Sequence, residues 1–425
     1  FGSSPCRLSP AQPRKGVPAG ELVPIATHRM RLASASLAIL VPLCSIVGQE
    51  VWLLTANLRY PVGAASDSLK MSAAVYGAHG PPREVLAVDP DRAQPLLPAA
   101  PGLIVINVTA AALNPVDFKQ MRSDQPNALA PKPRIAGFDV SGVVVSAGEG
   151  SGFAAGDAVF GMLPLVGSPW GSLAELTVGD ARCFARAPES IPLEEAAALP
   201  LVALTVMQVF DQAELVAAGA RTPDRKNQRI LVHAAAGGVG SFAVQYARNV
   251  LGFGHVVGTC SSKNAELVAG LGATATIDYA VDDFVEELVA AGGVDAVLDP
   301  MSWRYMERTL SAHGVLRPAA KYCHVLSSDW QPNAAERSLA TILQGPVAKW
   351  ASRLRGLVLP ATPQVFSTPV QPDAASLERL AALVDSGHVK PVIDRVFEGL
   401  PQAADALAYV QEGHARGKVV VRVSR

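Results

Sequence analysis

The sequence predicts an α/β protein in which a doubly wound parallel sheet follows a β-rich unit. Two observations predict the sheet: a glycine-rich turn joins a short apolar strand to a helix near residue 237, and three more strands then alternate with helices as far as residue 299. Alternation of this kind gives parallel βαβ units. A third observation predicts the β-rich unit, because short strands punctuated by glycine occupy residues 71–161 and no long amphipathic helix comes before Leu193.

The composition is that of a globular chain with room for two domains. Of its 425 residues, 49% are hydrophobic and 17% are charged, which is enough for two cores. The net charge of −1 gives no electrostatic reason to expect nucleic acid or an anionic membrane as the main partner. The 5 cysteines are scattered without C-x-x-C spacing, so neither a disulfide framework nor a cysteine-built zinc site is predicted.

Residues 1–70 differ from the rest of the chain. Up to residue 31 a single acid, Glu21, accompanies five basic residues among Ser, Pro and Ala, and an apolar run from Leu32 to Gly48 follows. The basic residues are Arg7, Arg14, Lys15, Arg29 and Arg31. This composition is typical of an organellar presequence, and we expect a mitochondrial leader before a chloroplast one. The apolar run is shorter than the ~20 residues that span a bilayer and contains Pro42. A membrane anchor, a secretory signal beginning at Met30, and a cytoplasmic chain with an unstructured leader stay open.

Alternating apolar residues predict the strands of the β-rich unit, which indicate a barrel-like arrangement. The strands are expected at Met71–Tyr76, Ile104–Val108, Gly137–Val145 and Gly156–Gly161. Two helical segments, Leu193–Ala198 and Leu201–Gln212, then lead into the parallel sheet.

The stretch Gln228–Arg248, QRILVHAAAGGVGSFAVQYAR, is predicted to form a strand, a tight turn and a helix. Its glycines leave no Cβ between the loop and a ligand, and a helix start presents free N–H groups and a positive dipole end, which suits a diphosphate. The turn residues are Ala236, Gly237, Gly238, Val239 and Gly240.

The elements after this turn continue the alternation. Strands are expected at His255–Cys260, Ala275–Asp278 and Val294–Asp299, with helices at Asn264–Leu271 and Asp282–Ala291. The whole segment therefore predicts a Rossmann dinucleotide-binding domain.

The end of the second strand indicates which dinucleotide binds. An Asp or Glu about 20 residues after the glycine turn would favour NAD by bonding its ribose hydroxyls, but this strand ends in Ser261-Ser262-Lys263. Hydroxyl groups and an ammonium can hold the extra phosphate of NADP. We therefore expect NADPH, against the alternative that these residues form only a solvated loop with a helix N-cap.

Six ordered motifs from Met71 to Val423 resemble the zinc-independent quinone oxidoreductase branch of the medium-chain dehydrogenases/reductases. They are Ala111–Asp117, Gly137-x-Asp139-x-x-Gly142-x-Val144, Ala198-Leu199-Pro200 with Leu204-Thr205, the glycine turn, Ile277-Asp278-Tyr279, and the tail Gly387–Ile393 with Gly413–Val419. Within this branch the tail is most similar to the reticulon-4-interacting type, a mitochondrial NADPH oxidoreductase.

The resemblance implies a bilobal enzyme whose GroES-like β-barrel catalytic domain is discontinuous, with the cofactor in the cleft between the lobes. The expected parts are a leader at 1–70, the first part of the catalytic domain at 71–200, the Rossmann NADPH-binding domain at 201–345, and the second part of the catalytic domain at 346–425. Zinc-dependent relatives have a Cys at the position of Asn114 and Gly-His-Glu where this chain has Gly137-Phe138-Asp139. We therefore expect no catalytic metal.

The resemblance also suggests roles for individual residues. Asn114 is expected to donate to a substrate carbonyl as negative charge develops on it, or else only to tie the turn before Pro115. Thr205 is expected near the cofactor, or as a helix hydroxyl bonded to its own backbone. Tyr279 is expected to stack near the adenosine or simply to pack. Asp139 is expected to brace the barrel.

Two classes of function follow from these expectations. The first is an NADPH-dependent reductase of a small quinone or α,β-unsaturated carbonyl, with an enoyl-thioester reductase disfavoured because Phe118–Ile135 lacks the tyrosine that such relatives use. The second is a cofactor-binding regulatory or interaction protein with little turnover, for which Met301-Ser302-Trp303, in place of a glycine pair, is the only hint. A homodimer stays open, and the segment Ile342–Leu357 is expected to pack as a helix.

Overall fold

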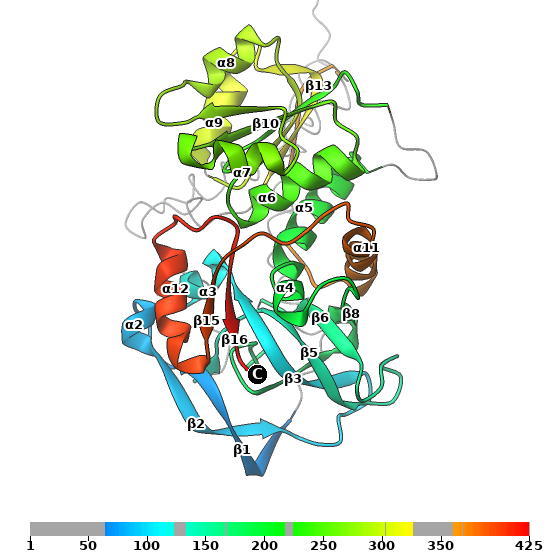
Figure 1. The fold of residues 1–425 in the computed structure, drawn as a ribbon, viewed down its shortest axis with the longest axis vertical. Helices are drawn as coiled ribbons and strands as arrows, with labels where there is room; N and C mark the ends of the chain where they lie inside the picture. The colour runs from blue at the N-terminus through cyan, green and yellow to red at the C-terminus, as the bar shows by residue number, and fades with distance from the viewer. Residues whose placement is uncertain are drawn as a thin grey trace, which may run out of the picture.

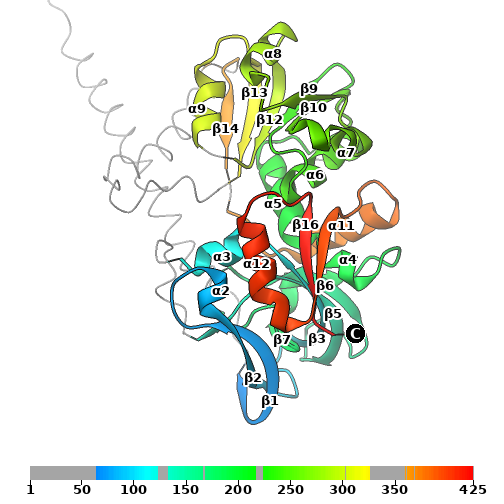
Figure 2. The ribbon, with the colours of Figure 1, turned by 60° about the vertical axis from the view of Figure 1, so that its left-hand side comes forward.

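The computed structural model describes residues 64–122, 133–165, 168–216, 224–301, 303–325, 359, 361–367 and 369–424. These residues form two lobes, seen in two views in Figures 1 and 2: one contains β9–β13 with helices α6–α9, and the other contains β1–β8, β15 and β16. The leader as far as residue 63 and the segment Ile342–Leu357 lie outside the described residues.

The first lobe is built on a six-stranded sheet in the order β11-β10-β9-β12-β13-β14, and every neighbouring pair is parallel. The order reverses beside β9, as in a Rossmann fold, so the predicted doubly wound sheet is confirmed. The strands are β9 (Arg229–Val232), β10 (His255–Cys260), β11 (Ala275–Asp278), β12 (Val294–Asp299), β13 (Leu316–His324) and β14 (Gln364–Phe366).

Short helices connect these strands, as the alternation predicted. They are α6 (Gly238–Gln245), α7 (Ala265–Gly270), α8 (Phe284–Ala290) and α9 (Trp303–Ser311). A π-helical turn, Tyr246–Val250, continues α6, so the helix expected to run to Arg248 changes its hydrogen-bond pattern in its second half.

The second lobe contains a seven-stranded sheet in the order β15-β16-β3-β5-β6-β8, with β7 also paired to β3, and a three-stranded sheet in the order β2-β1-β4. The larger sheet consists of β3 (Leu103–Leu113), β5 (Asp139–Ala147), β6 (Ala158–Met162), β7 (Leu176–Asp180), β8 (Phe184–Arg186), β15 (Ile393–Glu398) and β16 (Lys418–Arg422). The smaller one consists of β1 (Ala65–Tyr76), β2 (Leu86–Pro95) and β4 (Arg134–Ile135).

This lobe is discontinuous in sequence, because β16 pairs antiparallel with β3, with Val419 opposite Leu113. Its helices and the connecting helix α5 flank the sheets. They are α2 (Pro82–Val85), α3 (Pro115–Gln120), α4 (Leu193–Ala196), α5 (Pro200–Gln212), α11 (Ala374–Asp385) and α12 (Ala403–Gln411).

Two strands lie differently from the expected domain limits. β1 begins at Ala65, six residues before the expected start at Met71. β14 follows residue 345, where the second part of the catalytic domain was expected, yet it pairs with β13 in the six-stranded sheet. A three-residue strand carries too little periodicity to be recognised in the sequence.

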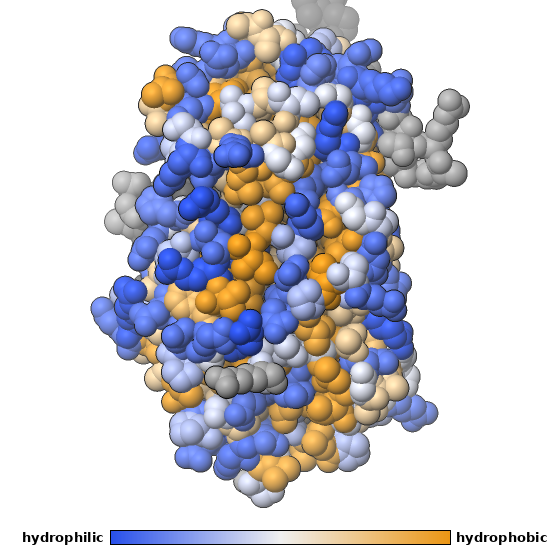
Figure 3. All heavy atoms as spheres, in the orientation of Figure 1, coloured by the Kyte–Doolittle hydropathy of each residue, from blue (hydrophilic) through white to orange (hydrophobic). Residues whose placement is uncertain are grey.

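One cluster of buried hydrophobic residues connects the two lobes. The largest cluster joins Ile106 and Phe160 of the barrel to Ile230 and Phe242 of the parallel sheet, with α5 residues such as Leu204 between them. Figure 3 shows apolar side chains running among polar ones down the middle of one face, from one lobe to the other. Within the described ranges, no helix is both long and apolar enough to span a membrane.

Candidate active site

The glycine turn lies at the carboxyl end of β9, and its geometry depends on small residues. A Cβ on Gly240 would lie 2.2 Å from the carbonyl oxygen of Ala234, so only glycine fits there. The first intrahelical bond of α6 runs from Ser241 N–H to Gly237 O. The N–H groups of Gly238, Val239 and Gly240 therefore precede the helical ladder and are available to an anion. This cradle fits the diphosphate of a dinucleotide.

The tail of the chain docks onto this turn. Gly417 N–H donates to Ala236 O at 2.8 Å, and Gly417 forms a parallel bridge with Gly237. The side chain of Lys418 then crosses Gly238, where an added Cβ would lie 3.0 Å from Lys418 Cδ. Residues far apart in the sequence thus complete the wall of the turn.

The loops after β10 and β11 lie at the same edge of the sheet, because the strands are parallel and adjacent. Ser262 N–H donates to Asp278 Oδ2 at 3.0 Å, and Ala280 N–H donates to Asp278 Oδ1 at 3.0 Å. These hydrogen bonds lower the pKa of the Asp278 carboxyl. Asp278 therefore stays ionised and holds the Ser262 loop in place.

The side chains at this edge face different surroundings. Ser262 and Lys263 are exposed, and Tyr279 is 60% exposed. The Ser261 hydroxyl is buried and has no hydrogen-bond partner among the described residues. The structure thus brings the glycine turn, Ser261–Lys263 and Tyr279 to one edge, and it leaves the Tyr279 ring open to a ligand.

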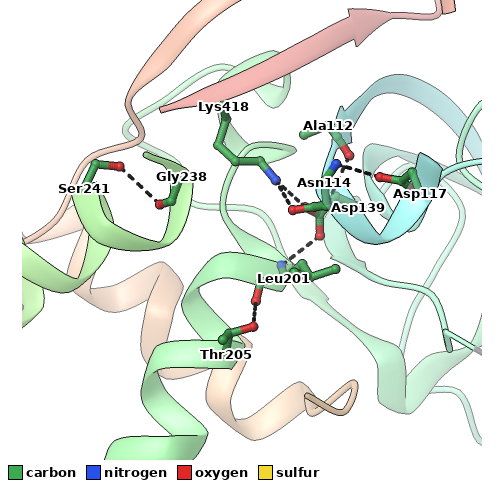
Figure 4. Close-up of polar contacts among 9 residues, drawn as sticks. All are labelled: Ala112, Asn114, Asp117, Asp139, Leu201, Thr205, Gly238, Ser241 and Lys418. Atoms are coloured by element: carbon green, nitrogen blue, oxygen red, sulfur yellow. Dashed lines mark hydrogen bonds and ion pairs between the residues drawn. The ribbon is translucent and has the colours of Figure 1, made fainter. Parts of the chain in front are cut away.

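A buried polar centre lies on the other side of the turn (Figure 4). Asn114, at the start of α3, donates from Nδ2 to Asp139 Oδ2 at 2.8 Å and, at 3.5 Å, to Ala112 O. Lys418 Nζ donates to Asn114 Oδ1 and, at 3.0 Å, to Asp139 Oδ2. Because an ammonium only donates, the Asn114 atom that faces it must be the oxygen. The orientation of the amide is therefore fixed.

Asp139 connects this centre to helix α5. Its Oδ1 accepts from Leu201 N–H at 2.8 Å, at the positive end of the helix. Burial raises the pKa of Asp139, while Lys418, Asn114 and Leu201 N–H oppose that rise. Asp139 therefore braces the barrel against α5 and the tail, as expected from the sequence.

Asp117 lies below Asn114 and accepts the backbone N–H of Asn114 on Oδ2 at 2.6 Å. Its Oδ1 is buried and has no partner among the described residues. Burial, against the opposing hydrogen bond from Asn114, raises the pKa of Asp117 from 3.8 to about 7. Asn114 thus ties its turn through its backbone and binds Asp139 and Lys418 through its side chain.

Other expected residues have structural roles in what is described. Thr205 Oγ1 donates to Leu201 O at 2.7 Å, which is the backbone-bonded alternative. Phe138 is buried, and the Arg134 guanidinium lies 5.6 Å from its ring centre. Within the described ranges, no group of three or more His, Cys, Asp or Glu side chains is arranged to hold a metal ion.

The sequence did not indicate Lys418 as a site residue, although Lys418 lies within the tail motif Gly413–Val419. The only signal was a lysine directly before the apolar strand residues Val419–Val421. The side chain is 5% exposed and belongs to the polar centre.

Comparisons with known proteins agree with this architecture. The "Alcohol dehydrogenase GroES-like domain" family model matches residues 100–189, and the "Zinc-binding dehydrogenase" family model matches residues 271–421. The chain is 34% identical over 322 residues to the Arabidopsis thaliana "Chloroplast envelope quinone oxidoreductase homolog", covering 75% of this chain and 89% of the relative. The chain is a medium-chain dehydrogenase/reductase.

Other members of this superfamily show the same likeness. The chain is 30% identical over 345 residues to "NAD(P)H oxidoreductase RTN4IP1, mitochondrial" of Danio rerio, covering 76% of this chain and 84% of the relative. It is similar in structure to the quinone oxidoreductase from Coxiella burnetii, with a TM-score of 0.68 and 27% identity over 83% of this chain and 99% of that one. As a medium-chain dehydrogenase/reductase, the chain is an oxidoreductase.

Proposed function

We propose that this oxidoreductase uses NADPH to transfer hydride to a small quinone or α,β-unsaturated carbonyl, without zinc. The observation that carries the proposal is the polar centre of Asn114, Asp139 and Lys418, an amide, a carboxylate and an ammonium directly beside a diphosphate-type turn. A bound nicotinamide would supply the hydride, and the protein would supply orientation and polarity.

The cofactor assignment is supported by the shape and charge of the sheet edge. The N–H groups of Gly238–Gly240 would hold the diphosphate, and the exposed Ser262 and Lys263 would bind the additional phosphate of NADPH. Asp278 would keep that loop in place through Ser262 N–H. The exposed Tyr279 ring would cover the adenine. Relatives named as NAD(P)H or NADPH oxidoreductases support the same class of cofactor.

The substrate class is supported by the relatives and by the chemistry of the centre. Relatives are named as a quinone oxidoreductase homolog, a 2-methylene-furan-3-one reductase and an alkenal/one oxidoreductase. Their named substrates carry a carbonyl conjugated to a double bond. Negative charge develops on a carbonyl oxygen during such a reduction, and fixed donors in a dry site stabilise it. Asn114 and Phe138 stand where zinc-dependent relatives have ligands, so the donors would be protein groups.

Steady-state oxidation of NADPH and NADH against a panel of quinones, enones and enoyl thioesters tests the proposal. We expect turnover with quinones or enones, a preference for NADPH, and no loss after dialysis against a chelator. Stoichiometric zinc in active protein would contradict the metal-free part. Tight NADPH binding without turnover on any member of the panel would instead favour the regulatory alternative.

We propose that the residues before β1, within the leader expected at 1–70, target the chain to an organelle. The support is their basic, acid-poor composition and the relatives named as chloroplastic or mitochondrial. A fluorescent protein fused to the leader would test this, since a diffuse cytosolic signal would contradict it.

A further inference from the structure

We propose that the Lys418 ammonium, and not the Asn114 amide, is the group that stabilises negative charge on the substrate oxygen. The inference rests on the proposed reductase function and names the group that performs its electrophilic step. It departs from the sequence-based expectation, which gave that role to Asn114 and no role to Lys418.

The amide of Asn114 is already engaged. One hydrogen of Nδ2 goes to Asp139 Oδ2 and the other lies toward Ala112 O, while Oδ1 accepts from Lys418. An amide has only two N–H donors. Donation to a substrate would therefore either displace the long 3.5 Å contact to Ala112 O or break the 2.8 Å bond to Asp139, which would leave a buried carboxylate oxygen with one partner fewer.

Lys418 offers a positive charge and one more N–H donor than its two acceptors among the described residues require. An ammonium carries three N–H donors, and within the described residues its acceptors are Asn114 Oδ1 and Asp139 Oδ2. Two of the three donors are thus used inside the protein. The third can serve a ligand without breaking either contact.

The ammonium is held rigidly beside the cofactor turn. The backbone just before it is fixed by Gly417 N–H to Ala236 O, and the stem of Lys418 lies against Gly238. Figure 4 shows the side chain reaching from the start of β16 past Gly238 to Asn114 and Asp139. A group fixed in this way needs no reorganisation when charge develops nearby.

The surroundings keep the charge effective. The Asp139 carboxylate accepts hydrogen bonds from Leu201 N–H and Asn114 Nδ2 as well as from Lys418. Lys418 is therefore not the only group that compensates its negative charge. The pair is nearly dry, with side chains 5% and 0% exposed, and charge interactions are stronger there than in water.

The chemical step is simple for an enone. Hydride from the nicotinamide of NADPH would add to the β-carbon, and the cofactor would be oxidised to NADP⁺. The π electrons of the carbon–carbon double bond would move toward the carbonyl, whose oxygen would become an oxyanion. A Lys418 N–H donates a hydrogen bond to that oxyanion. A proton from water at the α-carbon then restores the carbonyl, so one hydride and one proton are added to the double bond.

The test compares Lys418→Met, Lys418→Arg and the double variant Lys418→Met/Asp139→Asn, which leaves no unpaired charge in the centre. Lys390→Met is the matched control, because Lys390 is an exposed lysine on the same tail. At saturating NADPH we expect kcat with an enone to fall about 100-fold in both Met variants of Lys418. We expect Lys418→Arg to recover part of that loss and Lys390→Met to resemble the wild type.

Two further measurements do not depend on turnover. NADPH titration of the cofactor-free variants by fluorescence should give dissociation constants within about threefold of the wild type. Absorbance titration of NADPH-bound protein with 4-nitrophenol should show that the wild type prefers the phenolate form, because an ammonium favours a nearby anion. That preference should be lost in Lys418→Met.

The outcomes separate the alternatives. Wild-type kcat and unchanged phenolate preference in Lys418→Met would overturn the inference. A large loss of NADPH affinity with unchanged kcat would also overturn it, and would assign Lys418 to the cofactor phosphates. Absence of wild-type turnover on every quinone and enone would refute the proposed function, while the phenolate titration would still test the charge of the centre.

Discussion

The buried ion pair between Lys418 and Asp139 carries a desolvation penalty. Removing two charges from water costs several kcal/mol, which is recovered only with good geometry and further hydrogen bonds. Here Asp139 has them, from Leu201 N–H and Asn114 Nδ2. Removing one partner of the pair should therefore lower the free energy of unfolding more than replacing both partners with uncharged residues does.

We expect Asp139→Ala to lower the free energy of unfolding by about 3–5 kcal/mol, because it leaves the Lys418 ammonium buried and unpaired. The double variant Asp139→Ala/Lys418→Met should be more stable than the sum of the two single changes implies. Urea denaturation of the wild type and the three variants measures this coupling. If the two single changes in the free energy of unfolding simply add in the double variant, Lys418 and Asp139 do not stabilise each other.

Asp117 should make stability depend on pH. Its folded-state pKa, about 7, lies above its ordinary value of 3.8, so the folded protein holds this proton more tightly than the unfolded chain does. The carboxyl therefore favours folding at low pH, and this contribution is lost as the pH rises from about 4 to about 7. The charged and titratable groups facing it include Asp139, Lys418, Arg134 and Tyr76.

Replacement Asp117→Asn removes the titration and keeps an acceptor for Asn114 N–H. We expect the variant's stability, relative to the wild type, to increase from pH 4.5 to pH 7.5. Urea denaturation at several pH values measures the difference. A constant difference over that range would show that Asp117 keeps an ordinary pKa.

Asn114 shows how far the sequence alone could predict the site. Its motif indicated a place near the reacting groups, but its side-chain partners lie 25 and 304 residues away, at Asp139 and Lys418. No local pattern encodes such partners. The glycine turn and the Ser261–Lys263 loop could be placed at one sheet edge because each directly follows a strand.

At the scale of the elements, strand alternation was a reliable guide. The bounds of β10, β11 and β12 agree with the sequence prediction, because each is a compact apolar run between helical segments. The π-helical turn at Tyr246–Val250 was not predicted. Its backbone hydrogen bonds span five residues in place of four, and over a single turn this barely changes the spacing of the apolar residues. β14 is set by pairing with β13, not by its own three residues.

The turn before α6 should tolerate no side chain at Gly240. A Cβ there would lie 2.2 Å from Ala234 O, so we expect Gly240→Ala to cost at least about 1–3 kcal/mol of stability and to weaken NADPH binding. Gly270→Ala in α7 is the control, because its Cβ would meet nothing within 4 Å. That change should stabilise by up to about 1 kcal/mol. Thermal melts and cofactor titration check both, and equal effects would refute the steric argument.

Two glutamine side chains bind the backbone on either side of α11, at Gln371 before the helix and at Lys390 after it. Gln208 accepts from Gln371 N–H and donates to Gln371 O, at 3.0 and 2.8 Å. Gln245 makes the same pair of bonds with Lys390, at 3.0 and 2.9 Å. Each side-chain amide thus bonds both a backbone N–H and a backbone carbonyl of one residue.

We expect Gln245→Leu to cost about 1–3 kcal/mol, because it leaves polar backbone groups of Lys390 unsatisfied next to a buried side chain. Gln208→Leu should cost less, since the Gln208 side chain is only partly buried whereas that of Gln245 is buried. Urea denaturation ranks the two variants. The reverse order would contradict the burial argument.

At the scale of the whole molecule, one hydrophobic cluster connects the two lobes, and the buried polar centre connects the barrel to helix α5. The sequence predicted both folds, but only the family resemblance indicated that the barrel is discontinuous. Pairing of β16 with β3 cannot be derived from periodicity, because it joins residues that lie far apart in the sequence, such as Val419 and Leu113.

Residues before Met71 belong to strand β1. Leu96 N–H donates to Ala64 O at 2.8 Å, and β1 pairs with β2 from Ala65 onward. We expect a chain beginning at Ala64 to melt cooperatively and to bind NADPH as the full chain does. A chain beginning at Met71 should melt a few degrees lower, because it lacks the first pairs of the ladder. Calorimetry measures the melting temperatures of the two chains. Equal melting temperatures would show that residues 64–70 contribute nothing to stability.

The discontinuous barrel has a consequence for the order in which a ribosome delivers the chain. Lys418 lies 304 residues after Asn114, so at 5–20 residues per second roughly 15–60 s separate their synthesis. During that interval β3 lacks its β16 neighbour, and an unpaired strand edge invites association with other chains. The polar centre therefore assembles late, after the glycine turn and the strands of the parallel sheet have emerged. Nascent chains of this protein should depend on chaperones most strongly in that window.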